Sequence, residues 1–372
     1  MSNVATVDGI PVVRLSSAAE TAADVDTKPL ETAQDAVGPA QSRFRLRMSA
    51  IWWRSLQYVG MTMHYLAPPR PPNPSFTKTI PSTISETKGE FTLQFYTPEG
   101  YDTAPKTGRK FPAVINFHGG GFVLGSGTDD ARFAQFVLDQ CSSVFVSVDY
   151  RLSPEYPFPI PVDDAADAIL FVIRFAHDLH IDRDKLAISG FSAGGNLALT
   201  STLRLTDHLQ SLSKASNPIE IPPYRIRALA TWYPLTDYTT PRPLKRARCK
   251  RPDQTLPPAL TSLFDASYLY PPSLPLSNPY LSPSKATDAQ LAAALPETLI
   301  FYTCEWDMLL QEGEGLANRI KSEPIGKDVR YKMVKGVAHA WDKSPDPLKV
   351  AEGSEEVYKE CCAVLREAFE RE

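Results

Sequence analysis

The feature that most constrains the fold is a series of short, almost uninterrupted apolar runs separated by helical patterns. FPAVINFH (111–118) and SVFVSVDY (143–150) contain few polar residues, which is typical of strands buried on both faces. Because strands and helices alternate, we expect an α/β fold: a mostly parallel central sheet, right-handed crossovers and helices on both faces. Further parallel strands are expected at 186–191, 225–234, 297–306 and 329–336, and FTKTIPSTI and EFTLQFYTP are expected to form an antiparallel pair.

The N-terminal region lies outside this alternation. Residues 1–41 are rich in Ala, Thr, Asp and Ser and poor in large apolar groups, so we expect a disordered tail. Residues 42–66 have the pattern of an amphipathic helix that includes Trp52 and Trp53, and the proline-rich APPRPPNP at 67–74 ends it. We therefore expect the folded domain to span residues 42–372.

A second irregular segment, residues 236–295, interrupts the alternation between two expected strands. It is rich in proline and has one clear helical pattern, near 257–270. A loop this long in a compact domain is usually a lid or an inserted subdomain. Its basic run, residues 242–251, is expected to be a solvated loop, and a nuclear-targeting or anion-binding patch is the alternative.

Composition and charge narrow the classes of function. The formal net charge is −4, which argues against a nucleic-acid-binding protein. The five cysteines show no CxxC spacing, so we expect reduced thiols and a cytoplasmic location. The first thirty residues lack the pattern of a secretory signal. The sequence contains no run of 18 apolar residues, so we expect no integral membrane segment.

GFSAGG (190–195) fits the G-x-S-x-G nucleophile elbow and falls where a strand gives way to a helix. In such an elbow a sharp turn lifts the serine hydroxyl above the sheet edge, and the flanking glycines prevent clashes. The helix N-terminus behind the serine favours developing negative charge. Ser192 is therefore the candidate nucleophile.

A serine nucleophile needs a base and an acid, which follow it in this chain order. Of the six histidines only His208 and His339 come after Ser192, and His208 falls four helical turns away. His339 follows the last expected strand and is the candidate base. Asp307 and Glu305 both lie at the end of the preceding strand; alternation does not choose between them, and position favours Asp307.

The stretch HGGG (118–121) follows a buried strand. Backbone N–H groups without side chains in the way can surround an oxyanion, and the residue after the nucleophile, Ala193, supplies another N–H. The run therefore predicts an oxyanion hole.

Together these motifs resemble the hormone-sensitive-lipase-like branch of the α/β-hydrolases, the HGGG carboxylesterases. The resemblance spans about residues 80–370. It implies that Gly120 and Gly121 donate to the oxyanion with Ala193, that Asp307 is the acid, and that His118 braces the oxyanion loop. It also implies a cap formed by about residues 42–70 and 236–295. The motifs are HGGGF, VDYRLSPEYPFP, GFSAGGN, EWDMLLQEG and GVAHAW, in that order.

The chain departs from the branch's pattern at two positions. Phe191 precedes the nucleophile where Asp is usual, and Gln311 stands where an acidic residue is common. A phenylalanine at that position needs apolar neighbours, so we expect the surroundings of Phe191 to be apolar or aromatic.

The resemblance implies a serine carboxylesterase without metal or cofactor, acting on short to medium acyl esters or a natural-product ester, with a role in secondary metabolism suggested only by analogy. The alternatives are a same-fold dehydratase or lactonase and a non-catalytic ligand-binding relative. The binding relatives have lost the catalytic histidine, and His339 is present here. The sequence predicts neither the oligomeric state nor the substrate.

Overall fold

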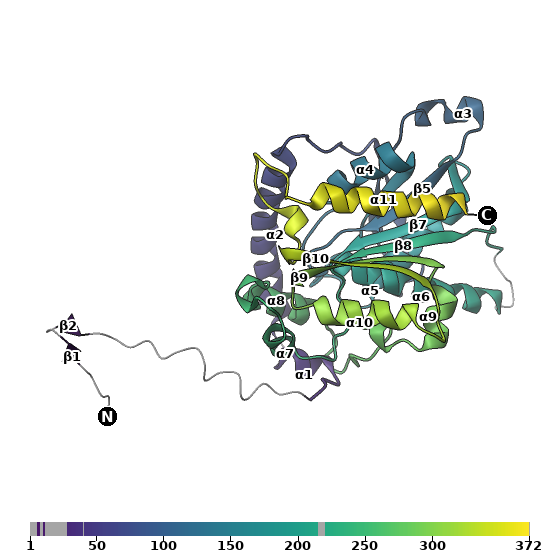
Figure 1. The fold of residues 1–372 in the computed structure, drawn as a ribbon. Coiled ribbons are helices and arrows are strands. Elements are labelled where there is room, and N and C mark those ends of the chain that lie inside the picture. The colour runs from purple at the N-terminus through teal and green to yellow at the C-terminus, as the bar shows by residue number, and fades with distance from the viewer. Residues whose placement is uncertain (1–5, 8–9, 12–27, 40, 215–219, 372) are drawn as a thin grey trace.

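One eight-stranded sheet organises the chain in the computed structural model, which describes residues 6–7, 10–11, 28–39, 41–214 and 220–371 (Figure 1). The strand order is β10-β9-β8-β7-β5-β6-β4-β3. The strands are β3 (Phe76–Pro81), β4 (Glu90–Tyr96), β5 (Phe111–Phe117), β6 (Val144–Asp149), β7 (Ile181–Phe191), β8 (Ile226–Trp232), β9 (Thr298–Trp306) and β10 (Asp328–Ala338).

The sheet is parallel from β6 to β10, and β4 and β3 extend it as an antiparallel pair at one edge. The expected mostly parallel α/β sheet and the antiparallel pair are therefore confirmed. In the register of the sheet, Phe117 at the end of β5 lies opposite Gly190, and Phe191 lies opposite Trp232. The carboxyl ends of the central strands therefore meet at one edge, where the motif residues follow.

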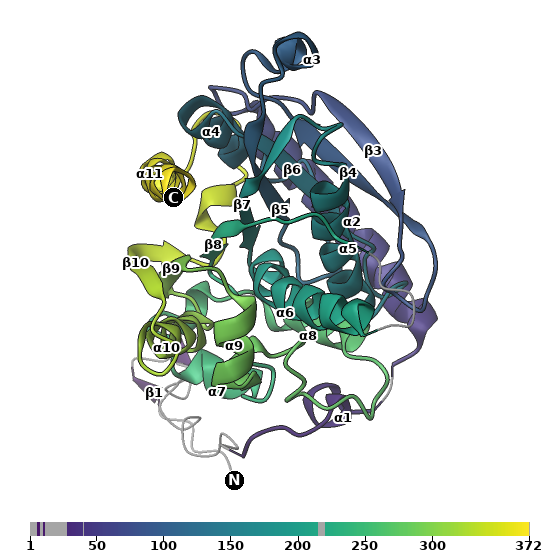
Figure 2. The same ribbon diagram turned by 90° about the vertical axis from the view of Figure 1, so that its right-hand side faces the viewer.

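Helices cover both faces of the sheet (Figure 2). α4 (Ala131–Cys141) packs with α11 (Ser354–Glu370) on one face. On the other face lie α5 (Ile160–Phe175), α6 (Ala193–Ser213) and α10 (Leu310–Lys321). The first half of α6 is buried against the sheet, as expected for the central crossover helix of such a fold.

The expected cap segments contain helices that pack together over the carboxyl edge. The N-terminal one is α2 (Arg43–Leu66), whose Leu46 and Ala50 are buried against Leu263 and Phe264 of α8 (Pro258–Tyr268). The insertion also contains the shorter helices α7 (Arg242–Ala247) and α9 (Asp288–Ala294). A four-residue helix, α3 (Ala104–Thr107), precedes β5.

The expected tail is too long at its C-terminal end. α1 (Ala33–Val37) lies against the insertion: Ala33 is fully buried, and its N–H donates to Leu274 O at 2.9 Å. The Leu30 N–H likewise donates to Thr239 O at 2.7 Å. Backbone hydrogen bonds, which composition does not reveal, hold this segment. Most of residues 1–27 lies outside the described residues, apart from β1 (Thr6–Val7) and β2 (Ile10–Pro11), which pair with each other.

The basic run 242–251 is not simply a solvated loop, and this expectation is wrong for its first half. The Arg242 guanidinium pairs with Asp265, and the Lys245 ammonium is buried against Glu312. Arg246 donates to Thr261 Oγ1 at 2.6 Å. Carboxylates outside the run therefore neutralise Arg242 and Lys245, and Arg246 is held by a neutral hydroxyl.

Candidate active site

Ser192 occupies a sharp turn between β7 and α6. Its backbone has φ 55° and ψ −114°, a conformation that costs a non-glycine residue energy. A Cβ at Gly194 would overlap the carbonyl oxygen of Phe117, and one at Gly190 would overlap the carbonyl oxygen of Gly194. Glycine is therefore required on both sides of the serine for the helix to begin this close to the sheet.

The three side chains predicted to act together meet above the carboxyl edge of the sheet. Ser192 Oγ lies 2.8 Å from His339 Nε2, and His339 Nδ1 lies 2.6 Å from Asp307 Oδ2. The His339 and Asp307 side chains are only 4% and 2% exposed. A second hydrogen bond, from the Leu309 N–H to Asp307 Oδ1 at 3.0 Å, fixes the orientation of the carboxylate.

Glu305, the rival acid, is held elsewhere. Its carboxylate pairs with Lys250 Nζ at 2.7 Å and accepts the Gly336 N–H at 2.8 Å. These interactions lower the pKa of Glu305, the Lys250 hydrogen bond most strongly. The structure therefore brings Asp307, and not Glu305, to the histidine.

The glycine run wraps around the end of β5. Gly120 and Gly121 have φ of 106° and 61°, in the left-handed region that favours glycine. A Cβ on Gly121 would also strike the ring of Phe264 in α8. Both glycines line one cavity with Ser192 and His339, and Gly121 and Ala193 line a smaller recess that also reaches the serine.

His118 lies beneath this run and is 1% exposed. Its ring stacks on Tyr150, with centroids 4.3 Å apart, and its Nδ1 lies 2.7 Å from Gly119 O. The Tyr150 hydroxyl donates to His118 O at 2.9 Å. These contacts place His118 as a support of the loop and away from the Ser192 hydroxyl, whose hydrogen-bond partner is His339.

Two hollows meet at Ser192. The larger has a volume of about 280 Å³ and is lined by α2 on one side (Gln57, Gly60, Met61) and by the insertion on another (Leu256, Leu260, Phe264). The smaller, of about 20 Å³, is lined by Leu235, Met308 and Leu309 among others. Both of the expected cap segments therefore contribute to the walls of the site.

The surroundings of Phe191 are aromatic, as predicted. Its ring stacks on Trp232 with centroids 4.2 Å apart, and Phe133 packs edge-on at 5.8 Å. The Lys343 Nζ lies 3.9 Å from the Phe191 ring centroid, within the range of a cation–π contact. The position usually occupied by aspartate in the branch is therefore built into an apolar stack with one cation above it.

A buried polar cluster adjoins that stack, and sequence reasoning missed it. Asp342 accepts the hydroxyl protons of Tyr233 and Tyr358 and pairs with Lys343 at 3.1 Å. Lys343 also pairs with Asp130 at 2.9 Å. The only signal in the sequence was the pair of opposite charges three and four residues after His339.

The cluster stabilises the charged forms of Asp342 and Lys343. Although burial opposes ionisation, Lys343 and the two tyrosine hydroxyls hold the pKa of Asp342 below its usual value. The two carboxylates likewise raise the pKa of Lys343 well above its usual value against the effect of burial. Because the Tyr233 ring also packs on His339 at 4.7 Å, the cluster supports the loop that carries the histidine.

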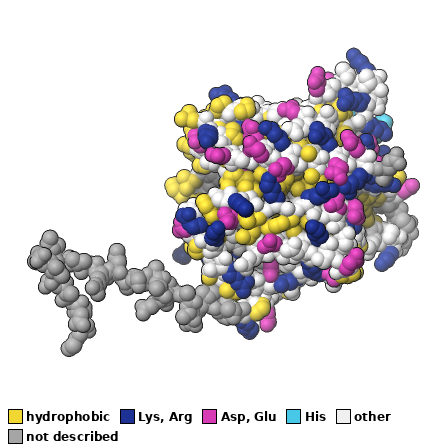
Figure 3. Space-filling model, in the orientation of Figure 1, with side chains coloured by type: hydrophobic (Ala, Val, Ile, Leu, Met, Phe, Trp, Pro, Cys, Tyr) yellow, Lys and Arg dark blue, Asp and Glu magenta, His cyan; other side chains and the backbone are white. Residues whose placement is uncertain are grey.

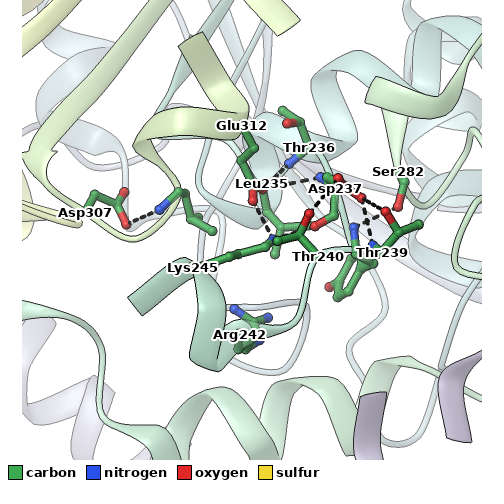
Figure 4. Close-up of polar contacts among 12 residues, drawn as sticks. Leu235, Thr236, Asp237, Thr239, Thr240, Arg242, Lys245, Ser282, Asp307 and Glu312 are labelled. Carbon is green, nitrogen blue, oxygen red and sulfur yellow. Dashed lines mark hydrogen bonds and ion pairs between the residues drawn. The ribbon is translucent and has the colours of Figure 1, made fainter. Parts of the chain in front are cut away.

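Glu312 links α10, the helix that follows Asp307, to the insertion (Figure 4). It was not among the residues singled out from the sequence. It lies in α10, a few residues after Asp307, and accepts the Thr236 N–H at 2.8 Å while pairing with Lys245 of α7. Burial raises the pKa of Glu312, and Lys245 opposes that rise. The motif EWDMLLQEG, which contains Asp307 and Glu312, was the signal available in the sequence.

Among the residues that the structure describes, no group of three or more His, Cys, Asp or Glu side chains is arranged to hold a metal ion. The five cysteines all lie in this part of the chain, and none is paired in a disulfide.

The sheet order, the elbow and the Ser–His–Asp arrangement define an α/β hydrolase, and comparison with known proteins agrees. A family model for the α/β-hydrolase fold matches residues 114–343, so the chain belongs to this family. Within it, the chain falls in the hormone-sensitive-lipase-like carboxylesterase branch that its motifs indicated.

Individual relatives support this placement. An arylesterase from Saccharolobus solfataricus is 31% identical over 232 residues, which cover 62% of this chain and 69% of that protein. An AB hydrolase superfamily protein from Schizosaccharomyces pombe is 29% identical over 261 residues, 70% of this chain and 71% of the other. The structure of a hyperthermophilic esterase from the archaeon Pyrobaculum calidifontis superposes with a TM-score of 0.66 at 26% identity, covering 87% of this chain and 93% of that one.

Proposed function

We propose that this protein is a serine carboxylesterase that works through an acyl-enzyme intermediate, with Ser192 as nucleophile, His339 as base and Asp307 as the orienting acid. The observation that carries the proposal is the continuous hydrogen-bonded line from Ser192 Oγ through His339 to Asp307 Oδ2, with contacts of 2.8 and 2.6 Å. A serine, a base and an orienting carboxylate within hydrogen-bond reach of one another are the signature of an activated nucleophile.

In the first half of the reaction, Ser192 Oγ attacks the ester carbonyl and its proton passes to His339 Nε2. The Nδ1–H of His339 faces Asp307, whose negative charge stabilises the imidazolium that forms. The imidazolium then donates its proton to the departing alkoxide, and the C–O bond of the ester breaks. Water repeats the sequence on the acyl-serine and releases the acid.

The carbonyl oxygen becomes an oxyanion in both halves. The backbone N–H groups of Gly120, Gly121 and Ala193 are the proposed donors, because these residues line the two hollows that reach Ser192. The positive end of α6, which begins at Ala193, adds favourable potential. No step in this route needs a metal or a cofactor.

The two hollows suggest the shape of the substrate. The 20 Å³ recess has room for a group only slightly larger than one water molecule. The 280 Å³ cavity admits a larger, mainly apolar group. We therefore propose esters with one short arm, of about the size of an acetyl or propionyl chain, and one larger arm.

An aryl-ester panel with labelling by a phosphonate tests this proposal. We expect turnover of aryl acetates and propionates to exceed that of aryl octanoates, because an aryl octanoate has two large arms and only one of the two hollows is large. Octanoate turnover equal to or above that of the acetates would contradict the proposed short arm. Mass spectrometry should find the phosphonate adduct on Ser192 and no adduct on a Ser192→Ala variant. An adduct on any other residue would contradict the assignment of the nucleophile.

The acid is tested by a matched pair of variants. Asp307→Asn should lower kcat by on the order of 10⁴, the loss typical when the orienting carboxylate of such a triad is neutralised. Glu305→Gln, two residues away, should leave kcat nearly unchanged because its carboxylate contacts Lys250 and Gly336. A crippled Glu305→Gln enzyme beside an active Asp307→Asn enzyme would reverse the assignment.

A further inference from the structure

α2 carries an apolar stripe on its outer face that no other described element covers. Its side chains recur every three or four positions, so they lie on one side of the helix, and each is between 41% and 70% exposed. Figure 3 shows hydrophobic surface on the side of the molecule where α2 lies in Figure 1. We call this the α2 stripe: Phe44, Met48, Ile51, Trp52, Leu56, Val59, Met63 and Leu66.

A single exposed apolar residue is ordinary, but a contiguous strip of this length marks an interaction site. The opposite face of α2 packs on α8 and lines the active-site cavity through Gln57, Gly60 and Met61. α2 is therefore apolar toward the exterior as well as toward the protein. These side chains leave between 41% and 70% of their surface exposed, so much of their apolar surface is available to a partner.

The charge of α2 indicates which kind of partner the α2 stripe binds. Between residues 43 and 66 there are four arginines and no aspartate or glutamate, although the whole chain has a net charge of −4. Arg43 and Arg54 donate to backbone carbonyl groups of the rest of the chain. The exposed cations of α2 are therefore Arg45 and Arg47, of which Arg47 is 56% exposed while it pairs with Glu155. Arginines beside a stripe of aromatic and aliphatic groups favour a partner that is both apolar and anionic.

We propose that the α2 stripe docks on the surface of an anionic lipid layer, with the helix lying in the plane of the interface. Helices of 20 to 30 residues with large apolar groups on one side and arginines beside them bind lipid surfaces in this way. Trp and Tyr prefer the headgroup level, and Trp52 and Tyr58 are 63% and 76% exposed. None of the helices in the described residues has the length and apolarity needed to cross a bilayer, which is consistent with a helix that lies on the surface.

A second copy of the chain fits the stripe less well. Pairing places the exposed Arg45 of each copy at the interface, and α2 has no carboxylate to neutralise it. An anionic lipid surface supplies that negative charge. The oligomeric state of the protein in solution distinguishes the two occupants.

Docking has a consequence for the substrate, which rests on the proposed esterase activity. Because the inner face of α2 lines the 280 Å³ cavity, a docked molecule holds that cavity beside the lipid. Apolar esters dissolved in the layer then reach the site without crossing water. The larger arm of the substrate is accordingly an apolar group that partitions into lipid.

Flotation with vesicles tests the docking separately from the chemistry. The full chain with Ser192→Ala is mixed with phosphatidylcholine vesicles or with vesicles that also contain phosphatidylglycerol. We expect it to float with the anionic vesicles and much less with the neutral ones. Ile51→Glu with Trp52→Glu should reduce the bound fraction by about tenfold or more, since two large apolar groups leave the lipid. Phe175→Glu, which changes an exposed apolar residue of α5, is the matched control and should bind like the parent.

Three results would overturn the proposal. The first is a parent chain that does not float with anionic vesicles, or a double variant that floats equally well. The second is a parent that is dimeric in solution and becomes monomeric in the double variant, which would assign the stripe to a second copy. The third is slow tryptic cleavage at Arg14 that the double variant accelerates, which would assign the stripe to the chain's own N-terminal segment. A failure to label Ser192 would refute the esterase proposal and leave the docking result unaffected.

Discussion

Replacing Phe191 with aspartate restores the residue usual in this branch and tests the packing beneath the elbow. Phe191 is 1% exposed and stacks on Trp232 with centroids 4.2 Å apart. An aspartate leaves most of that space empty and brings a carboxylate among aromatic rings. We expect the variant to be less stable than the parent, although its sequence is closer to that of its relatives.

The magnitude follows from two effects. Truncating a buried phenylalanine typically costs about 3–5 kcal/mol. The new carboxylate faces Lys343, but that ammonium already has Asp130 and Asp342 at 2.9 and 3.1 Å, so a third carboxylate adds repulsion and desolvation and gains little attraction. We expect a net loss of about 3–5 kcal/mol. For a chain of this length the unfolding entropy converts that loss into a fall in Tm of roughly 4–7 °C.

Thermal and urea unfolding of the parent, Phe191→Asp and Phe191→Leu measure this loss. Leucine keeps an apolar group without the stacked ring, so it should lose about 1–2 kcal/mol. The gap between the two variants measures the emptied space and the carboxylate together. If Phe191→Asp were as stable as the parent, the Lys343 cluster would have room for a further acid, and our reasoning on the aromatic stack would be wrong.

Three more predictions concern groups away from the nucleophile. Burial and two nearby cations lower the pKa of His64 to about 4 from 6.5. Between these pH values the unfolded chain binds a proton at His64 that the folded chain does not, so the free energy of unfolding should fall by about 3 kcal/mol as the pH falls from 6.5 to 4. Urea unfolding across this range should show a flatter pH dependence for His64→Gln and an unchanged one for His177→Gln, and equal curves for the two would refute this. Asp342→Asn removes one of the two carboxylates that hold a buried ammonium, so it should cost about 3 kcal/mol and lower kcat more than it raises KM; an unchanged Tm and kcat would contradict the supporting role. Deleting residues 1–27 should leave Tm unchanged, whereas deleting 1–39 should lower it because α1 is docked, and equal Tm values would show that α1 adds no stability.

The parts of the site that the sequence predicted are those with fixed local geometry. A glycine-flanked serine at a strand–helix junction forms the same turn wherever it occurs, so Ser192 could be assigned from five letters and their context. His339 could be assigned because loops after parallel strands gather at one sheet edge. The choice between Asp307 and Glu305 needed more than side-chain alternation. β9 ends at Trp306, and only the residue beyond it turns toward the histidine.

Contacts between distant segments could not be predicted from the sequence. Lys245 and Glu312 are 67 positions apart, and the basic run gave no sign of which carboxylate each cation meets. The sequence likewise did not indicate the partners of Asp342, because one of them, Tyr233, is 109 positions away. α1 has the composition of a disordered segment, and backbone hydrogen bonds to the insertion hold it in place. Pairing of this kind depends on the complete fold.

Ser192 and His339 are separated by 147 positions along the chain, and the histidine follows β10, the strand at the far edge of the sheet. During synthesis the nucleophile emerges long before its base. A nascent chain that has folded as far as β9 holds Ser192 in its elbow with no His339 to accept its proton, and only the addition of β10 brings the base to it. On the proposed mechanism, hydrolysis begins only after synthesis has passed His339, and the appearance of activity reports that the last strand has joined the sheet.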